Sequence, residues 1–411
     1  NFIFSFTGLI LYVTTPRILG DSFLYKDVLF LSFFSFAFYF LIKSINELNY
    51  KNLLIFAVFS SLCLNLRPFA IFIPFFFTFI ITLKSFNLKN FKENSKKIIF
   101  YFFCYFFSLY IFWPYLWADP LNNFVEMFLS VKANLVDVKI LYNGNFISNR
   151  MVPDFYTLKW IFISTPVLQS TFFLLGYLFC FFRIIRRFLG IKENTIHHDL
   201  WRGDKEQIDF TFFIFLSLFY FFIILFNAPL YNGWRLLYFL NIFLIYFSIN
   251  FLFNLKSFFK RKKIENFIIL LILLLISFNI YGVIKTHPYQ SLYYNSLISE
   301  KTKSNYEGDY HGLSMKHFFE ELIKRDNRQL IKVAVASHTP VQRGLESIDI
   351  EYRKKFQVVG QEYHQAEYIF KNNISEVNSN LIKKYQIPSN FKKIFELNID
   401  KSVIYEAYKI N

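Results

Sequence analysis

Long apolar runs separated by short basic stretches constrain this chain more than any other feature of its sequence. A helix needs about 20 mostly apolar residues to cross a bilayer, and backbone polar groups inside a bilayer are satisfied only in helices or closed barrels. We therefore expect an α-helical polytopic membrane protein with about nine transmembrane segments. The apolar runs span about 1–15, 28–43, 52–66, 68–83, 98–117, 159–182, 210–226, 235–254 and 266–284.

The third and fourth runs are short and meet at Arg67-Pro68. They predict either a tight helical hairpin or one kinked helix. The chain begins with Asn1 inside an apolar run, so we expect a fragment whose first helices are missing.

The charged residues divide the chain into two domains. Residues 285–411 hold 19 Lys and Arg and 15 Asp and Glu, which is typical of a soluble domain, whereas the whole chain has a net charge of +16. Most of the excess therefore lies between apolar segments, which argues against a nucleic acid partner. The sequence predicts a transmembrane domain at 1–284 and a small α/β domain at 285–411.

The positions of the basic residues predict an orientation. The loops at about 43–51, 84–97, 183–209 and 255–265 together hold 18 Lys and Arg, and the alternate loops hold 8. The positive-inside rule places the richer set in the cytoplasm. Arg183, Arg186, Arg187 and residues 260–263 are then expected to be solvated anchors. The C-terminal domain falls on the outer side, which is the periplasm if this is a bacterial inner membrane.

Two regions outside the spans carry secondary-structure signals. In the outer loop at 118–158, apolar residues recur at helical spacing from Asn123 to Val138 and predict an amphipathic helix. In the C-terminal domain, residues 313–325 predict a helix, and a hairpin is expected around 398–401. Strands are expected at 332–337, 352–359, 366–370, 395–397 and 402–408.

The outer loop Thr15–Asp27 is the best candidate for chemistry. It holds the acids Asp21 and Asp27 and the bases Arg17 and Lys26 at the end of a membrane segment. Ionised groups at that depth are expensive unless paired or functional, and the two cations suit a phosphate. Asp27 alone has a simpler reading, because Asp favours the N-cap of a helix.

Three motifs resemble one known family. They are Pro16-Arg17-Ile18-Leu19-Gly20-Asp21-Ser22-Phe23 with Lys26-Asp27, then Asn232-Gly233-Trp234-Arg235, then His287-Pro288-Tyr289-Gln290 through Asn295 with Gly308-Asp309-Tyr310-His311. In this order they resemble the GT-C membrane glycosyltransferases, close to bacterial relatives of protein O-mannosyltransferase and of the aminoarabinose lipid A transferase (glycosyltransferase family 39-like).

The resemblance implies transfer of a sugar from a polyprenyl-phosphate donor to a lipid, glycan or protein acceptor on the outer face of the membrane. Asp27, with Asp21, would assist the reacting groups, and Arg17, Lys26 and Arg235 would contact the donor phosphate. The family's main catalytic acid lies in an earlier outer loop that this sequence does not contain. Asp21 also stands where relatives carry His, and Tyr25 where they carry Asn.

For the other candidate site residues, the sequence allows a structural as well as a functional interpretation. Arg67 and Arg235 are either snorkelling anchors or anion contacts. Five residues after the last span are either an interfacial aromatic belt or the rim of a substrate pocket, and Asp309 is either structural or part of that pocket. The five are His287, Tyr289, Gln290, Tyr293 and Asn295.

Two function classes compete with the enzyme. A transporter or flippase of lipid-linked glycans usually has polar residues at mid-membrane or broken helices in related halves, and these segments are apolar there. A sensor with an outer ligand-binding domain would not need so many helices. The three Cys all lie in apolar runs and show no ligand spacing. We expect no cofactor, with a divalent metal left open.

Overall fold

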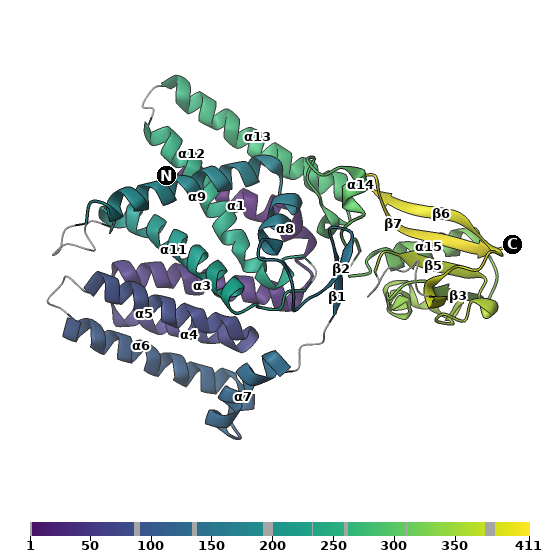
Figure 1. Cartoon of the computed structure of the whole chain (residues 1–411), viewed down its shortest axis with the longest axis horizontal. Coiled ribbons are helices and arrows are strands. Elements are labelled where there is room, and N and C mark those ends of the chain that lie inside the picture. The colour runs from purple at the N-terminus through teal and green to yellow at the C-terminus, as the bar shows by residue number, and fades with distance from the viewer. Residues whose placement is uncertain are drawn as a thin grey trace. The chain divides into compact units, whose positions relative to one another are not determined.

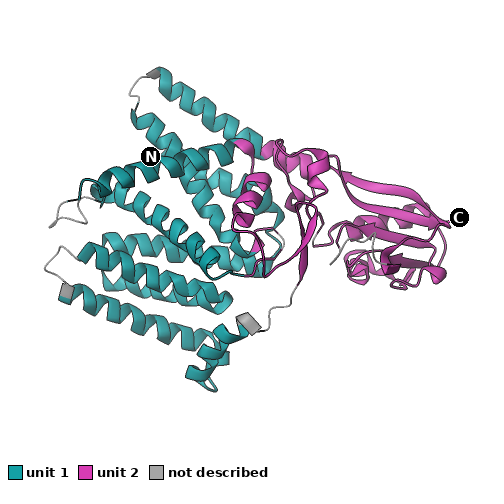
Figure 2. Cartoon of the chain, in the orientation of Figure 1, with its two compact units in different colours: residues 1–136, 168–228, 236–279 teal, residues 137–167, 229–235, 280–411 magenta. Residues whose placement is uncertain are grey.

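The computed structural model describes the chain in eight stretches (Figure 1), namely residues 2–85, 91–133, 138–191, 200–231, 233–258, 262–309, 311–374 and 383–411. The chain divides into two compact units (Figure 2). Unit 1 comprises residues 1–136, 168–228 and 236–279, and unit 2 comprises residues 137–167, 229–235 and 280–411. The sequence boundary at 284/285 lies close to the last of these junctions, but unit 2 also takes in two earlier segments.

Helices make up nearly all of unit 1. Among the described residues, seven helical stretches are long and apolar enough to cross a membrane, and α1 and α4 are shorter apolar helices. The chain is thus a helical multi-pass membrane protein. The helices are α1 (Phe2–Thr14), α2 (Pro16–Gly20), α3 (Tyr25–Asn46), α4 (Tyr50–Leu66), η1 (Pro68–Ile71), α5 (Phe72–Ser85), α6 (Phe91–Phe112), η2 (Pro114–Leu116), α7 (Pro120–Ala133), α9 (Val167–Phe188), α11 (Gly203–Leu225), η3 (Arg235–Leu240), α12 (Asn241–Phe258) and α13 (Lys262–Thr286).

The structure has a helical hairpin, and not one kinked helix, at Arg67-Pro68. Arg67 is extended, with φ −146° and ψ 119°, because a residue before proline is disfavoured in the helical region. The rings of Phe56 on α4 and Phe77 on α5 lie 5.2 Å apart between centroids. These residues flank the turn at similar distances along the chain, so α4 and α5 run antiparallel side by side.

One predicted membrane segment has the wrong start, because the span covers Val167–Phe188. The apolar run at 159–182 forms two helices, α8 (Tyr156–Ser164) and α9, rather than one. Thr165 between them is extended, with φ −114° and ψ 142°, and it precedes Pro166. The same restriction on the residue before proline that ends α4 therefore ends α8.

Aromatic packing fixes α3 against α11 and α12 in unit 1. The Phe34 ring lies 5.7 Å from the Phe215 ring, and the Phe38 ring lies 5.2 Å from the Phe243 ring. Phe215 and Phe243 also stack at 5.4 Å. Each pair is within the range for favourable ring contacts, so the middle of α3 is closely packed against α11 and α12.

The predicted amphipathic helix at Asn123–Val138 is present as α7, which begins at Pro120 and is described to Ala133; residues 134–137 lie outside the described residues. A β-hairpin that follows was not predicted from the sequence. Its strands are β1 (Lys139–Tyr142) and β2 (Asn145–Ser148), paired antiparallel. The turn residues Asn143 and Gly144 have φ of 53° and 79°, the backbone that an Asn-Gly hairpin turn requires.

The C-terminal part of unit 2 is a helix packed on a five-stranded sheet. The strand order is β4-β3-β5-β7-β6, with β3 parallel to β4 and β5, and with β7 antiparallel to β5 and β6. The elements after the membrane part are η4 (Gln290–Leu292), α14 (Glu300–Lys303), α15 (Ser314–Arg325), β3 (Ile331–Val335), η5 (Val341–Ser347), α16 (Ile350–Arg353), β4 (Phe356–Val358), η6 (Tyr363–Gln365), β5 (Tyr368–Asn372), η7 (Lys383–Tyr385), β6 (Phe391–Ile399) and β7 (Ser402–Ile410).

This arrangement confirms the predicted small α/β domain, with one local error. The helix at 313–325 and the hairpin around 398–401 are present, and both hairpin turn residues, Asp400 and Lys401, have positive φ. The segment 352–359 was predicted as a strand throughout, but it begins in α16 and only Phe356–Val358 joins the sheet. The core between α15 and the sheet includes Phe318, Val333 and Phe370, each fully buried.

Candidate functional site

The acid-base loop of the sequence folds into α2 and the first turn of α3. Leu24 is the N-cap residue of α3 and makes no side-chain cap bond. Asp27 lies three residues further on and is buried. The N-cap interpretation of Asp27 is therefore wrong, and its carboxylate needs another partner.

That partner is Arg67. An Arg67 guanidinium nitrogen donates to Asp27 Oδ1, and the two side chains are only 14% and 2% exposed. Arg67 stands at the α4–η1 turn, where its extended backbone ends one helix before the next begins. Removing one member of such a buried pair usually costs about 3–5 kcal/mol, because the other charge stays behind in a low dielectric. Arg67 is thus a contact of the candidate acid.

Asp21 is the second buried carboxylate of this region, at 6% exposure. It ends α2, and its backbone N–H donates to the Arg17 carbonyl at 3.0 Å. Tyr238 of η3 also contacts α2, because its hydroxyl donates to the Ile18 carbonyl at 2.5 Å. A residue 220 positions away therefore helps to fix the segment that carries both acids.

The three predicted phosphate contacts differ in setting. Arg17 on α2 is half-buried, and Lys26 on α3 is exposed. Both lie in unit 1 with Asp21 and Asp27. Arg235 is half-buried and lies in unit 2, directly after Trp234, whose indole N–H donates to Ser164 Oγ at 2.9 Å. Asn232 of the same motif lies outside the described residues.

The predicted rim after the last span lies in unit 2 and is mostly packed inside it. The backbone N–H of Asn295 donates to the Ile163 carbonyl at 2.9 Å, and its side-chain amide donates to the Thr165 carbonyl at 3.0 Å. Tyr289 and Tyr293 are buried, and burial raises the pKa of Tyr289 to about 12. This packing does not resemble an exposed aromatic belt.

His287 and Gln290 form a smaller contact in the same stretch. His287 is exposed, and its Nδ1 lies 2.9 Å from Gln290 Nε2. Gln290 is buried. The pair leaves an imidazole edge at the surface of unit 2, supported by a buried amide.

Asp309 has a clear structural contact. Its two carboxylate oxygens accept from the backbone N–H groups of Leu313 and Ser314, at 2.8 and 2.9 Å. It thereby satisfies the first donors of α15, which a helix start leaves without partners. Burial raises the pKa of Asp309 to about 6.

A second ionic cluster in unit 1 corrects one expectation. Arg183 and Arg187 were expected to be solvated anchors, but Arg183 pairs with Asp209 at 2.6 Å and Arg187 pairs with Glu206 at 2.8 Å. Asp209 is fully buried and also accepts from the Tyr246 hydroxyl. The acidic residues near the start of α11 were the sequence signal from which these ion pairs could have been predicted. Residues 260 and 261 of the other basic run lie outside the described residues.

The geometry supports acid-base and anion-binding chemistry at the α2–α3 segment. Two buried carboxylates, one paired guanidinium and further cations at positions 17 and 26 lie within or against a short stretch of unit 1. Within the described ranges, no group of three or more His, Cys, Asp or Glu side chains is placed to hold a metal ion. No protein-family model, curated protein or solved structure matches the chain.

Proposed function

We propose that this chain is a membrane glycosyltransferase of the GT-C type, which moves a sugar from a polyprenyl-phosphate donor to a lipid, glycan or protein acceptor. The observation that carries the proposal is the buried ion pair of Asp27 and Arg67, with a second buried carboxylate at Asp21 shortly before Asp27 in the sequence. Ionisable side chains in membrane segments are costly to bury, which makes them candidates for a functional site.

The chemistry of the transfer accounts for these residue types. An acceptor hydroxyl must lose a proton, and a carboxylate in hydrogen-bond reach can assist that step. Asp27 has this role in the proposal, and Arg67 orients its carboxylate. The leaving lipid phosphate gains negative charge, which Arg17 and Lys26 would stabilise. The sugar moves from the phosphate oxygen to the acceptor oxygen, and no redox partner is needed.

The proposed orientation agrees with this pairing. In the scheme with nine crossings, the loops at 16–27 and at Arg67 are independently assigned to the outer side by the distribution of basic residues. The ion pair joins these same two loops. The scheme puts the reaction at the outer face of a bacterial inner membrane and unit 2's sheet domain in the periplasm.

A transfer assay tests the proposal against the transporter alternative. Membranes containing the full-length protein are given a polyprenyl phosphate that carries a radiolabelled sugar. The labelled acceptor is then separated from the labelled polyprenyl carrier, and each is counted. The proposal expects label on the acceptor and free polyprenyl phosphate. Movement of the intact carrier across the bilayer without transfer would instead support a flippase.

Asp27→Asn should lower transfer by about 100-fold or more if its carboxylate assists proton removal. Glu47→Gln is the matched control, because Glu47 is an exposed acid at the opposite end of the same helix. Equal transfer by native protein and a normally folded Asp27→Asn variant would refute the assigned role.

A further inference from the structure

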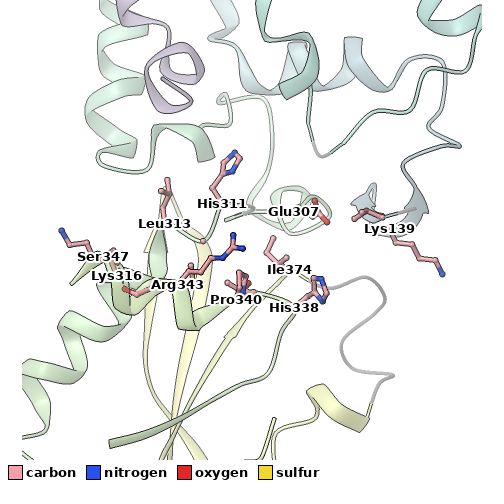
Figure 3. A pocket seen from close by; sticks show the side chains of 15 residues that line it. Lys139, Glu307, His311, Leu313, Lys316, His338, Pro340, Arg343, Ser347 and Ile374 are labelled. Carbon is pink, nitrogen blue, oxygen red and sulfur yellow. Dashed lines mark hydrogen bonds between the residues drawn. The ribbon is translucent and has the colours of Figure 1, made fainter. Parts of the chain in front are cut away.

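Unit 2 contains a cavity that the proposed transfer does not use. It has a volume of about 630 Å³ (Figure 3), within the range of small-molecule sites. Its walls come from the turn before α15, the first turn of that helix, the segment from His338 to Ser347, and Glu307 with Lys139 of β1.

The walls are held by contacts at close range. Asp309 binds the first N–H groups of α15, so that helix end is already satisfied and is not itself the binding group. Gly312 adopts φ 67° in the turn beside it. Gly344 of η5 lies so close to α15 that a Cβ there would meet Met315 Cβ at 2.6 Å. Any larger residue at position 344 would push the two walls apart.

The lining is strongly cationic. Lys139, Lys316 and Arg343 contribute positive charge, and His311 and His338 add two imidazoles. Figure 3 shows the Arg343 guanidinium directed into the middle of the lining side chains, while the ends of Lys139 and Lys316 point outward on opposite sides. Arg343 is therefore the central cation, and the lysines lie at the rim.

Of the described residues that line the cavity, Glu307 is the only one with a carboxylate. It is 4% exposed, and burial raises its pKa to about 8 although the Leu141 backbone hydrogen-bonds it. Among the described residues, its Oε2 atom has no hydrogen-bond partner. A raised pKa favours the neutral carboxyl, so Glu307 adds little negative charge to the cavity near neutral pH.

We propose that this cavity binds a small organic phosphate, with the Arg343 guanidinium and the imidazoles of His311 and His338 on the phosphate oxygens. Arg binds phosphate oxygens in a bidentate fork. The three cations of the lining, Lys139, Lys316 and Arg343, suit the charge of a phosphate group better than the single charge of a carboxylate. The cavity is larger than one phosphate ion, and Leu313, Met315 and Pro340 give the remaining lining an apolar part for the organic group.

Titration calorimetry on the purified full chain tests this site with three probes: glucose 6-phosphate, inorganic phosphate and glucose. The site should bind glucose 6-phosphate at least about tenfold more tightly than either of the others, because only that probe fills both parts of the cavity. Arg343→Gln should weaken binding of glucose 6-phosphate by at least about tenfold through the loss of charge-assisted hydrogen bonds. Arg343 is exposed, so this variant should fold normally.

Two further variants separate a specific site from general attraction to positive charge. Lys354→Gln removes an exposed charge outside the cavity and should leave binding within about twofold. Glu307→Gln keeps a neutral side chain of the same shape at this buried position and should also leave binding within about twofold.

Three results would overturn the proposal. They are equal binding of glucose 6-phosphate by native protein and Arg343→Gln, equal weakening by Lys354→Gln, and absence of binding by the folded native chain at millimolar probe. Loss of sugar transfer by Asp27 variants has no bearing on this site, so the two proposals fail separately.

Discussion

Replacing Glu307 with Gln removes a buried ionisable group without changing the shape of the side chain. Glu307 is 4% exposed, and burial raises its pKa from 4.5 to about 8. In the native protein the folded state therefore holds this proton across a pH range in which the unfolded state has released it. The free energy of unfolding must fall as pH rises through that range.

The size of the effect follows from the two pKa values. Each pKa unit is worth about 1.4 kcal/mol, so the native protein should lose about 2–3 kcal/mol between pH 6 and pH 8 from Glu307 alone. Asp309, whose pKa is about 6, also lowers the free energy of unfolding as pH rises, but most of that decrease occurs below pH 6. Burial lowers the pKa of His317, which acts in the opposite direction but equally in both proteins.

Hydrogen exchange of the β3 amides measures the result, because this strand lies inside the sheet between β4 and β5 and opens only in large unfolding events. Because the unfolded native chain releases this proton near pH 4.5, Glu307→Gln should already be more stable than native protein by about 2 kcal/mol at pH 6. At pH 8 the difference should grow to about 4–5 kcal/mol. Parallel free-energy curves from pH 6 to pH 8 would refute the reasoning.

Two other substitutions test contacts within single units. Gly176→Ala should destabilise the helix packing by about 1–3 kcal/mol, because the new Cβ would lie 2.0 Å from the Phe247 carbonyl oxygen. The control Gly8→Ala should have the melting temperature of native protein, because its Cβ meets side chains only at 3.8 Å or more. Equal melting temperatures for all three proteins would contradict the close contact at Gly176. Asp400→Asn should speed exchange in the β6–β7 hairpin by about tenfold or more, because the carboxylate accepts from the nearly buried Lys303 at 2.8 Å, and unchanged exchange would show that this pair does not stabilise the hairpin.

The helices and the sheet domain were largely predictable because their signals are local. Apolar runs located most helices, and alternating residues located most strands. The break at Thr165-Pro166 was missed because the apolar character continues through it, although proline carried the signal. The β1–β2 hairpin was missed in the same way, since Asn143-Gly144 is a strong turn pair set in a loop with few other signals.

The partners within the candidate site were less predictable because they depend on packing. Asp27 and Arg67 are 40 residues apart in sequence, and only the α4–α5 hairpin shows how Arg67 reaches the first turn of α3. Glu307 is a similar case. It lies in a polar stretch with no periodicity, and its burial depends on the segment around β1, which is far away in sequence but belongs to the same unit.

Sugar transfer by the double variant Asp27→Asn/Arg67→Gln tests the central claim most directly. Both side chains become neutral amides, so no unpaired charge is left buried and the helices should fold with a melting temperature close to that of native protein. If the pair is the working centre of a glycosyltransferase, the folded double variant should transfer labelled sugar from the polyprenyl carrier at less than about 1% of the native rate. Transfer at the native rate would show that the pair only stabilises the fold.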